Sequence, residues 1–189
     1  MSKQMYQLKI QLVGIDPPIW RKFAVPADIT MDRLHDVIQI VMGWEDEHLH
    51  SFRIGNNRYE KKYPESELEG GRDSSKYRLC DLINRKTQTF QYLYDFGDSW
   101  DHKITLEDNN YSNADLKTTL ACIQGKRACP PEDVGGVPGY YELLESLANP
   151  KDPEDMEDEE YDIFTEVFGD DFDAEEFDME QINKALIDY

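Results

Sequence analysis

The residues best suited to chemistry in this sequence are its histidines and the aspartates near them. His48 and His50 stand two residues apart at the start of an alternating segment, so we expect a strand that points both imidazoles to one face. His102 lies in a second alternating segment, just after the turn that contains Asp98. Imidazole and carboxylate groups are ligands for zinc, iron and manganese. The set His48, His50, His102 and Asp98 is therefore a candidate site for a divalent transition metal.

A structural interpretation of the same histidines is also open. In it, the rings lie at the edge of the core and form hydrogen bonds with carboxylates and tyrosines. A pair of histidines spaced by one residue is a weak sign of a metal when nothing fixes a third ligand. The sequence therefore requires no cofactor, and a divalent transition metal is the one cofactor that it suggests.

A second candidate site is the segment CPPEDVGG, which spans residues 129–136. Its prolines and glycines restrict the chain, and such a loop can hold carboxylates for acid–base work, metal binding or ligand binding. Tyr94 is the last residue of one predicted strand and Trp100 is the first residue of the next, so both lie beside the hairpin turn and add an aromatic surface. The candidate binding residues are therefore Glu132, Asp133, Trp100 and Tyr94. The alternative is that the two carboxylates cap a helix that begins near Pro138.

The three cysteines match no known motif. Six residues separate Cys122 from Cys129, which is more than the two to four residues between paired ligands of a zinc ribbon. We expect both, like Cys80, to be small buried residues. Their odd number favours a reducing compartment, and we expect a cytoplasmic protein. The sequence also lacks a nucleophile elbow, a phosphate-binding glycine loop, a dinucleotide fingerprint and an HExxH motif.

Hydrophobic periodicity predicts the elements that position these residues. Alternation predicts strands over 5–13, 19–25, 48–54, 89–94 and 100–107, with a shorter strand near 58–62. Helical spacing predicts helices over 30–43, 80–83, 140–147, 154–168 and 173–187, the first of them capped by Thr30 and stopped by Gly43. The segment 122–139 holds three prolines and four glycines, so we expect it to be irregular.

The order of these elements favours an α+β fold over a parallel α/β sheet. We expect an N-terminal ββα unit and antiparallel strands in a mixed or antiparallel sheet, within a single domain over residues 1–189. Residues 150–189 are expected to form acidic helices packed on that sheet. Burying a large apolar side chain contributes roughly 1.5 to 3 kcal/mol, whereas an exposed like-charge pair costs a few tenths of a kcal/mol. Burial should therefore outweigh the repulsion between the carboxylates of this region.

The charge of the chain limits its partners. The net charge is −20, and residues 150–189 contribute −15 of it through 17 acidic and 2 basic residues. A field of this sign repels phosphate backbones and anionic membranes, so we expect neither duplex DNA binding nor membrane association. The basic residues between Arg58 and Arg78 form either a local patch or an ordinary solvated loop. No apolar run approaches the roughly 18 to 20 residues that a membrane-spanning helix needs.

Several long segments resemble one known family. They are GIDPPIWRKFAVP, LHDVIQIVMGWEDEHLHSFRIG, YLYDFGDSWDHKITLE and CIQGKRACPPEDVGGVPGYYELLESLANP, followed by the acidic FGDDFDAEEFDMEQINKAL. They are similar to the plasmid pRiA4b ORF-3-like proteins, also known as TnpR-type passenger proteins of insertion elements, from about Tyr6 to Leu186. The resemblance implies an α+β fold and an association with mobile elements, but no established biochemical activity. Many members of that family have a further cysteine in place of Val134, so a metal site built on Cys122 and Cys129 would be incomplete here.

Three interpretations of function follow, of which the third is a nucleic-acid-linked role that the resemblance to mobile-element proteins implies and that the net charge opposes. The first is a non-enzymatic binding or accessory module whose partner is a protein or a small polar ligand. A basic or hydrophobic protein would complement the acidic region. The second is a metal-dependent hydrolase or nuclease that uses the histidine and aspartate set. The sequence does not decide whether the protein is an enzyme, and a stoichiometric transition metal in protein purified without a histidine tag would favour the second interpretation.

Overall fold

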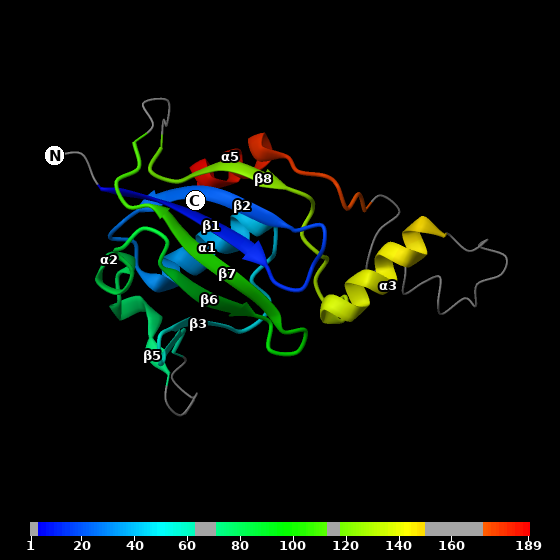
Figure 1. Ribbon diagram of the computed structural model, residues 1–189, viewed down its shortest axis with the longest axis horizontal. Coiled ribbons are helices and arrows are strands. Elements are labelled where there is room, and N and C mark those ends of the chain that lie inside the picture. Colours follow the sequence, from blue (N-terminus) through cyan, green and yellow to red (C-terminus); the bar gives the residue numbers. More distant parts are fainter. Residues whose placement is uncertain (1–3, 63–70, 113–117, 150–171) are drawn as a thin grey trace.

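The computed structural model describes residues 4–62, 71–112, 118–149 and 172–189. These residues form one eight-stranded sheet with helices against it, which confirms the α+β class (Figure 1). The strands are β1 (Met5–Leu12), β2 (Trp20–Pro26), β3 (His50–Ile54), β4 (Asn57–Glu60), β5 (Arg72–Asp73), β6 (Thr89–Tyr94), β7 (Trp100–Asp108) and β8 (Ala121–Lys126). The helices are α1 (Met31–Met42), α2 (Leu79–Leu82), α3 (Gly136–Ala148) and α5 (Met179–Asp188). None of these described helices is long and apolar enough to cross a membrane.

The strands run across the sheet in the order β5-β4-β3-β6-β7-β1-β2-β8. Neighbours are antiparallel except β4 and β5, which are parallel, so the sheet is mixed. The hairpin of β1 and β2 followed by α1 is the predicted ββα unit. β1 also pairs with β7, and this pairing joins the N-terminal hairpin to the later hairpin of β6 and β7 in the middle of the sheet.

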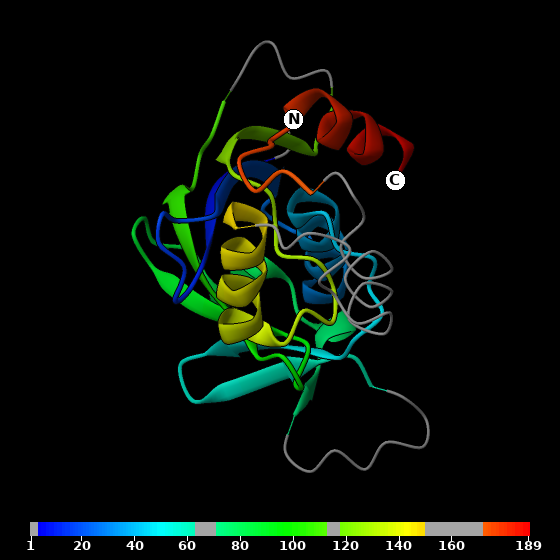
Figure 2. The same cartoon turned by 90° about the vertical axis from the view of Figure 1, so that its right-hand side faces the viewer.

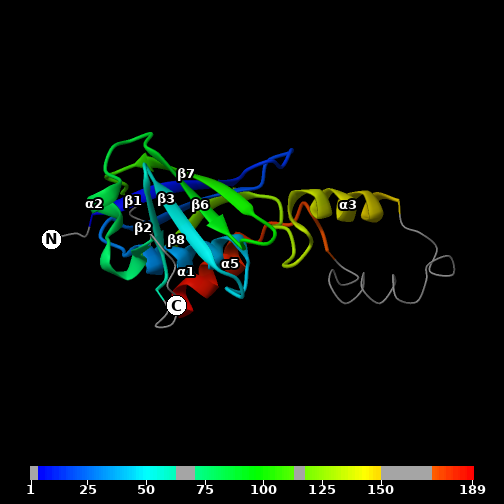
Figure 3. The ribbon, with the colours of Figure 1, turned by 90° about the horizontal axis from the view of Figure 1, so that it is seen from below.

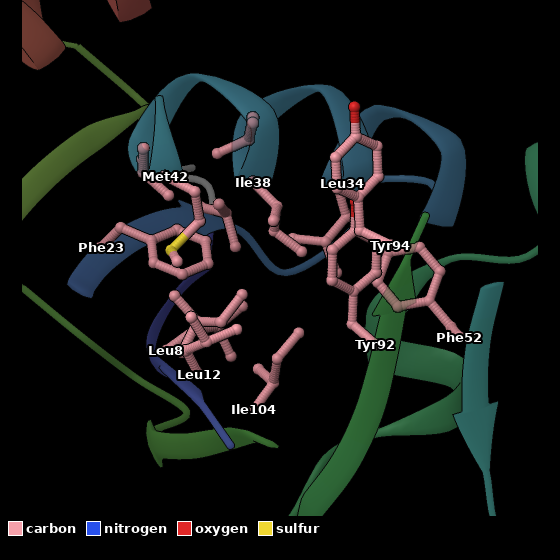
Figure 4. Close-up of a cluster of buried hydrophobic side chains, with 14 of the residues drawn as sticks. Leu8, Leu12, Phe23, Leu34, Ile38, Met42, Phe52, Tyr92, Tyr94 and Ile104 are labelled. Carbon is pink, nitrogen blue, oxygen red and sulfur yellow. The ribbon is translucent and has the colours of Figure 1, made fainter. Parts of the chain in front are cut away.

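The core lies between α1 and one face of the sheet. Alternate residues of β1 are buried, and the residues between them are only partly covered. Leu34, Ile38 and Met42 of α1 lie over Leu8 and other apolar residues of the sheet (Figure 4). α1 and α5 lie on the same side of the sheet (Figure 2). The alternation of the strands therefore produces one face under the helices and one more exposed face.

α1 begins and ends at the predicted residues, but its first residue is held differently. Thr30 has an extended backbone and its side chain makes no capping hydrogen bond, so the predicted capping role is not seen. Instead, the backbone N–H of Met31 donates to the carbonyl of Tyr77 at 3.0 Å. At the other end, Gly43 adopts the left-handed conformation with φ 96°, which glycine accepts without a steric cost. This reversal turns Trp44 back toward the core.

The segment 122–139, predicted to be irregular, contains a strand and the start of a helix. β8 pairs with β2 and extends to Lys126, because the prolines and most of the glycines come after it. Gly125 fits within β8 because the ring of Phe177 and the side chain of Arg21 occupy the space where a Cβ would stand. α3 begins at Gly136 and not at Tyr140, since proline is tolerated in the first turn of a helix.

The acidic C-terminal helix packs on the fold, as the sequence predicts. α5 lies against β8 and α1. The Asn183 amide pairs with the backbone of Cys122, donating to its carbonyl at 3.0 Å and accepting from its N–H at 2.8 Å. β8 is an edge strand, and this pairing covers two of its free backbone groups. α5 begins at Met179, later than predicted, because Asp178 caps it by accepting from the N–H of Gln181 at 2.9 Å. The helix predicted over 154–168 lies outside the described residues.

Candidate functional site

Three loops meet at the end of the sheet from which α3 projects (Figure 3). They are the α1–β3 loop, the β6–β7 loop and the β8–α3 loop. The indole N–H of Trp44 donates to the carbonyl of Pro130 at 3.0 Å, which ties the first loop to the third. The N–H of Gly135 donates to Asp98 at 3.0 Å, which ties the third loop to the second. The CPPEDVGG segment is therefore held from both sides.

His48 lies among carboxylates from these loops. Its Nε2 is 3.3 Å from Oδ1 of Asp133 and 3.6 Å from Oε2 of Glu132, and its Nδ1 is 3.8 Å from Oδ1 of Asp95. The imidazole is about three-quarters buried, whereas the Asp133 side chain is 67% exposed. We name these four residues the outer cluster. It has a closed side formed by the loops and an open side at Asp133.

Two atoms of the outer cluster are buried and have no hydrogen bond within the described residues. They are Nε2 of His48 and Oε2 of Glu132, which face each other. The second oxygen of Glu132, in contrast, accepts from the hydroxyl of Tyr94 at 3.0 Å and from the N–H of Glu45 at 3.2 Å. Burial raises the pKa of the Glu132 carboxyl, and burial together with Glu132 raises the pKa of Tyr94. The Tyr94 and Glu45 contacts thus hold Glu132 so that its free oxygen points toward His48.

The backbone at two members of the outer cluster is strained. Asp95 has φ 54° and Asp133 has φ 53°, values that residues other than glycine rarely adopt. Asp95 is stabilised in this conformation, because its carboxylate accepts from the N–H of Gly97 at 2.8 Å and its own N–H donates to Leu49 at 2.9 Å. Strained residues concentrate at functional sites. Their occurrence on two different loops that face the same histidine marks this cluster as a candidate site.

His50 lies apart from His48, in a buried group with His35. β3 begins at His50, so His48 precedes the strand and the two rings do not share a strand face as predicted. The rings of His50 and His35 stack with centroids 3.4 Å apart. Nδ1 of His35 is 2.8 Å from the hydroxyl of Tyr92, and its Nε2 is 2.6 Å from Asp46. Burial lowers the pKa of His35 to about 4 and that of His50 to about 3, so both are neutral at pH 7.

His102 is enclosed in the core beside this group. Its Nδ1 lies 3.3 Å from the carbonyl of Tyr92, and its ring meets the ring of Trp44 edge-on. Burial lowers its pKa to about 4. We name His35, His50 and His102 the inner histidines. The predicted set of four is thus divided between the inner histidines, the outer cluster and Asp98, which holds the CPPEDVGG segment.

The predicted binding residues lie at or beneath the outer cluster. Glu132 and Asp133 face His48, and Tyr94 bonds to Glu132. Trp100 is completely buried, and Trp44 lies between it and Tyr94 in the aromatic layer below. Sequence reasoning did not select Asp95 or the pair of His35 and Asp46. Asp95 could have been selected because it directly follows a predicted strand, where the chain enters the turn. Nothing in the sequence near His35 indicates that its ring is buried.

Two groups of side chains come close enough to share a metal ion among the described residues. One is His48 with Asp95 and Asp133, and the other is His35 with Asp46 and His50, each with ligand atoms within 4.8 Å of one another. The cysteines belong to neither group. Cys122 is buried, and burial raises its thiol pKa to about 11, which disfavours the thiolate that a metal requires.

The comparisons with known proteins cover nearly the whole chain. The sequence profile of the plasmid pRiA4b ORF-3-like protein family matches residues 4–181. The uncharacterized protein y4hQ of Sinorhizobium fredii is 33% identical over 190 residues, which span 100% of this chain and 93% of that protein. The crystal structure of the protein of unknown function MM3350 from Methanosarcina mazei Go1 is similar, with a TM-score of 0.79 and 36% identity, over 95% of this chain and 98% of that one. This chain therefore belongs to the plasmid pRiA4b ORF-3-like family.

Proposed function

We propose that this protein is a non-enzymatic binding module whose outer cluster takes up one divalent transition-metal ion. The observation that carries the proposal is the pair of buried atoms, Nε2 of His48 and Oε2 of Glu132, that face each other without a hydrogen bond. The two atoms lie within the distance of an ion pair, and a buried polar group without a hydrogen bond costs about 1 to 3 kcal/mol. A bound ion would satisfy both at once.

The distances in the outer cluster suit ligands of one ion. Two ligands about 2.0 to 2.2 Å from a metal lie roughly 3 to 3.6 Å from each other. Nε2 of His48 is 3.3 Å from Asp133 and 3.6 Å from Glu132. We assign His48 and Asp133 as ligands, since both belong to the group whose ligand atoms lie within 4.8 Å of one another. Glu132 lies outside that group, and we assign it as a third ligand because its free oxygen faces the same nitrogen. Asp95 faces Nδ1 and takes the place of the carboxylate that commonly orients a metal-bound histidine.

The inner histidines are less suited to a metal. Both nitrogens of His35 already have partners, in Tyr92 and Asp46. His50 lies flat against His35, so the lone pairs of the stacked rings run parallel and do not converge on one point. Nε2 of His50 also lacks a hydrogen bond among the described residues, but its ring is buried and stacked on His35, whereas the outer cluster opens to solvent at Asp133.

The open side of the outer cluster gives the proposed ion a role in binding. Asp133 is largely exposed, so a donor atom from a protein or a small polar ligand can reach an ion beside it. One histidine and two carboxylates leave coordination positions for such a donor. The ion would then bridge the module and its partner. Association with mobile elements is an expectation from the family name alone.

A metal-dependent hydrolase or nuclease is the second candidate function. One observation favours it: burial raises the pKa of Glu132, which lies beside the proposed ion. A carboxyl group with a raised pKa is better suited to accept and release a proton than an ordinary surface carboxylate. In this alternative Glu132 transfers protons and does not bind the ion. Turnover of a phosphodiester or ester by the metal-loaded protein, lost in Glu132→Gln while metal affinity is unchanged, would favour hydrolysis over binding alone.

Isothermal titration of metal-free, untagged protein with Zn²⁺ and Mn²⁺ tests the proposal. We expect one ion per chain, with an affinity at least tenfold weaker in His48→Gln and in Asp133→Asn. Asp101→Asn is the matched control, because Asp101 is an exposed carboxylate of the adjacent β7 outside the cluster. Binding that is unchanged in His48→Gln, or no binding by the wild-type protein, would contradict the proposal.

A further inference from the structure

The face of the sheet opposite α1 carries polar side chains. Buried and more exposed residues alternate along β1 and β7, so each strand sends every second side chain to this open face. Lys9 and Gln11 of β1 and Lys103 of β7 are among them. α1 and α5 lie on the other side (Figure 2). The chemistry of the open face is therefore set by the residues that line up across neighbouring strands.

The register of the strands places six of these side chains in one continuous row. Directly opposed pairs link each strand to the next, from the edge strand β8 to β3. In order, the row is Lys126, Trp20, Gln11, Lys103, Gln91 and Arg53. The neighbouring strands of a sheet lie about 4.8 Å apart, so the row is roughly 24 Å long.

The row is basic in a strongly acidic protein. It contains three cations, two amides and one tryptophan, and no carboxylate, whereas the chain as a whole has a net charge of −20. The adjacent row places Lys9 directly opposite Lys22. Like charges in this position are destabilising. Within the fold, Lys22 is compensated by Glu107 and Lys9 by the ring of Trp20.

Carboxylates are also present on this face, outside the row. Glu107 pairs with Lys22 at 2.9 Å, and Asp101 lies two residues before Lys103 on the same face of β7. A hollow of about 420 Å³ lies over the middle of the row, and its lining includes Arg53, Gln91, Lys103 and Asp101. No ion pair of Arg53, Lys103 or Lys126 is found within the described part of the chain, so these cations are available to a ligand.

We propose that this open face binds single-stranded nucleic acid. Cations at Lys126, Lys103 and Arg53 would contact phosphates along the row, and the amides of Gln11 and Gln91 would contact base edges. Trp20 offers an indole ring on which a base can stack. The base would displace the Lys9 ammonium, which lies 5.0 Å from the centroid of that ring. Sheets that bind single strands combine basic and aromatic side chains in this way. Amides and an aromatic ring suit bases better than they suit an acidic peptide.

The carboxylates of α5 do not exclude this binding. α5 lies on the opposite side of the sheet, and packed layers are separated by about 10 Å. The Debye length is about 8 Å at physiological ionic strength, so solvent ions screen much of that repulsion. Few phosphates are contacted, so binding should be weak and sensitive to salt. A duplex would present a curved backbone to this row, and its bases are stacked inside the helix where Trp20 cannot reach them. This agrees with the expectation that duplex DNA is not bound.

Fluorescence measurements on the full chain test the proposal with a short fluorescein-labelled oligothymidylate. We expect saturable anisotropy that falls with salt, and at least tenfold weaker binding by Arg53→Gln/Lys103→Gln. The slope of log affinity against log salt should decrease by about 1.4, as expected for two lost phosphate contacts. Lys76→Gln/Lys86→Gln is the control of equal charge, because those lysines pair with Asp73 and Asp108 away from the row. It should bind within twofold of wild type.

Tryptophan emission supplies a second readout. Trp44 and Trp100 are buried, so quenching by unlabelled oligothymidylate should come from Trp20 and disappear in Trp20→Phe. The proposal is overturned if wild-type protein shows neither anisotropy change nor quenching at low salt. It is also overturned if both double variants lose affinity equally, or if polyglutamate competes as well as the oligonucleotide, which would indicate an acidic-peptide surface.

Discussion

The inner histidines and the outer cluster use the same side chain in opposite ways. His35 and His102 are enclosed, with hydrogen bonds to tyrosine, aspartate or backbone, and His50 is stacked on His35. His48 is partly open, and its Nε2 faces carboxylates to which it makes no hydrogen bond. Only one residue separates His48 from His50, and β3 begins between them. The position at which β3 begins therefore separates the structural histidine, His50, from the candidate functional histidine, His48. The spacing of the two histidines does not.

The difference is also one of energy. Neutral imidazoles in the core are compatible with burial, whereas their charged forms are not. Both regions contain buried atoms without a hydrogen bond and an aspartate with positive φ, but the outer cluster opens to solvent at Asp133, whereas the inner histidines are enclosed. We therefore expect changes to the inner histidines to affect folding, and changes to the outer cluster to affect binding.

The largest expected effect is loss of stability in mild acid. Burial lowers the pKa of His35 and His102 from 6.5 to about 4 in the folded state. Above pH 6.5 both rings are neutral in folded and unfolded chains, so they add no pH dependence. Between about pH 6.5 and 4 the unfolded chain binds protons that the folded chain does not, so the free energy of unfolding falls by several kcal/mol in order of magnitude. Urea denaturation at a series of pH values measures this, and a flat profile between pH 7 and 5 would contradict it.

Next in size is the substitution His35→Ala. It removes the partners of Tyr92 and Asp46 and leaves a cavity beside His50, so we expect a loss of about 3 kcal/mol in the free energy of unfolding. Zn²⁺ affinity, measured at a temperature where the variant is folded, should stay within a few-fold of wild type. A large loss of metal affinity with little loss of stability would reverse the roles assigned to the two regions.

The fold was largely predictable because its signals are local. Alternation in β1, β6 and β7 and helical spacing in α1 follow directly from burial on one face. β8 was missed because its sequence, ACIQGK, lies beside prolines and glycines and depends on contacts with β2 and α5. Gly125 is accepted there only because Phe177 and Arg21 fill the space next to it.

The candidate site was predictable only in its parts. Glu132, Asp133 and Tyr94 were selected from a rigid loop and a strand end, and His48 from its residue type. Their convergence depends on Trp44 and Asp98, which pin the loops across long sequence separations. His50 was grouped with His48 because alternation was extended across the start of β3, where the chain has not yet entered the sheet. His102 was added from the strand after the Asp98 turn, and its enclosure in the core has no local signal.

Tyr94→Phe probes the connection between the two regions. The hydroxyl donates to Glu132 and accepts from the N–H of Glu47, so its removal should cost about 1 kcal/mol of stability. It should also weaken metal binding about tenfold, because Glu132 loses an orienting contact. Calorimetric titration and thermal denaturation of the same sample give both values. Unchanged metal affinity would show that the Tyr94 hydroxyl does not orient a metal ligand.

The smallest expected effect on folding comes from His48→Gln without metal. His48 makes no hydrogen bond to the surrounding carboxylates, so we expect the free energy of unfolding to stay within about 0.5 kcal/mol of wild type. Urea denaturation beside His35→Ala gives the contrast under identical conditions. Equal destabilisation by the two substitutions would mean that His48 is a structural residue.

The most direct test of metal binding at the outer cluster is nuclear magnetic resonance of the four imidazoles. Long-range ¹H–¹⁵N spectra, recorded before and after one equivalent of Zn²⁺, report which ring nitrogen binds the ion. We predict that Nε2 of His48 shifts strongly, whereas the nitrogens of His35, His50 and His102 keep their positions. A shift of His35 or His50 with His48 unchanged would place the metal at the inner histidines and contradict the account.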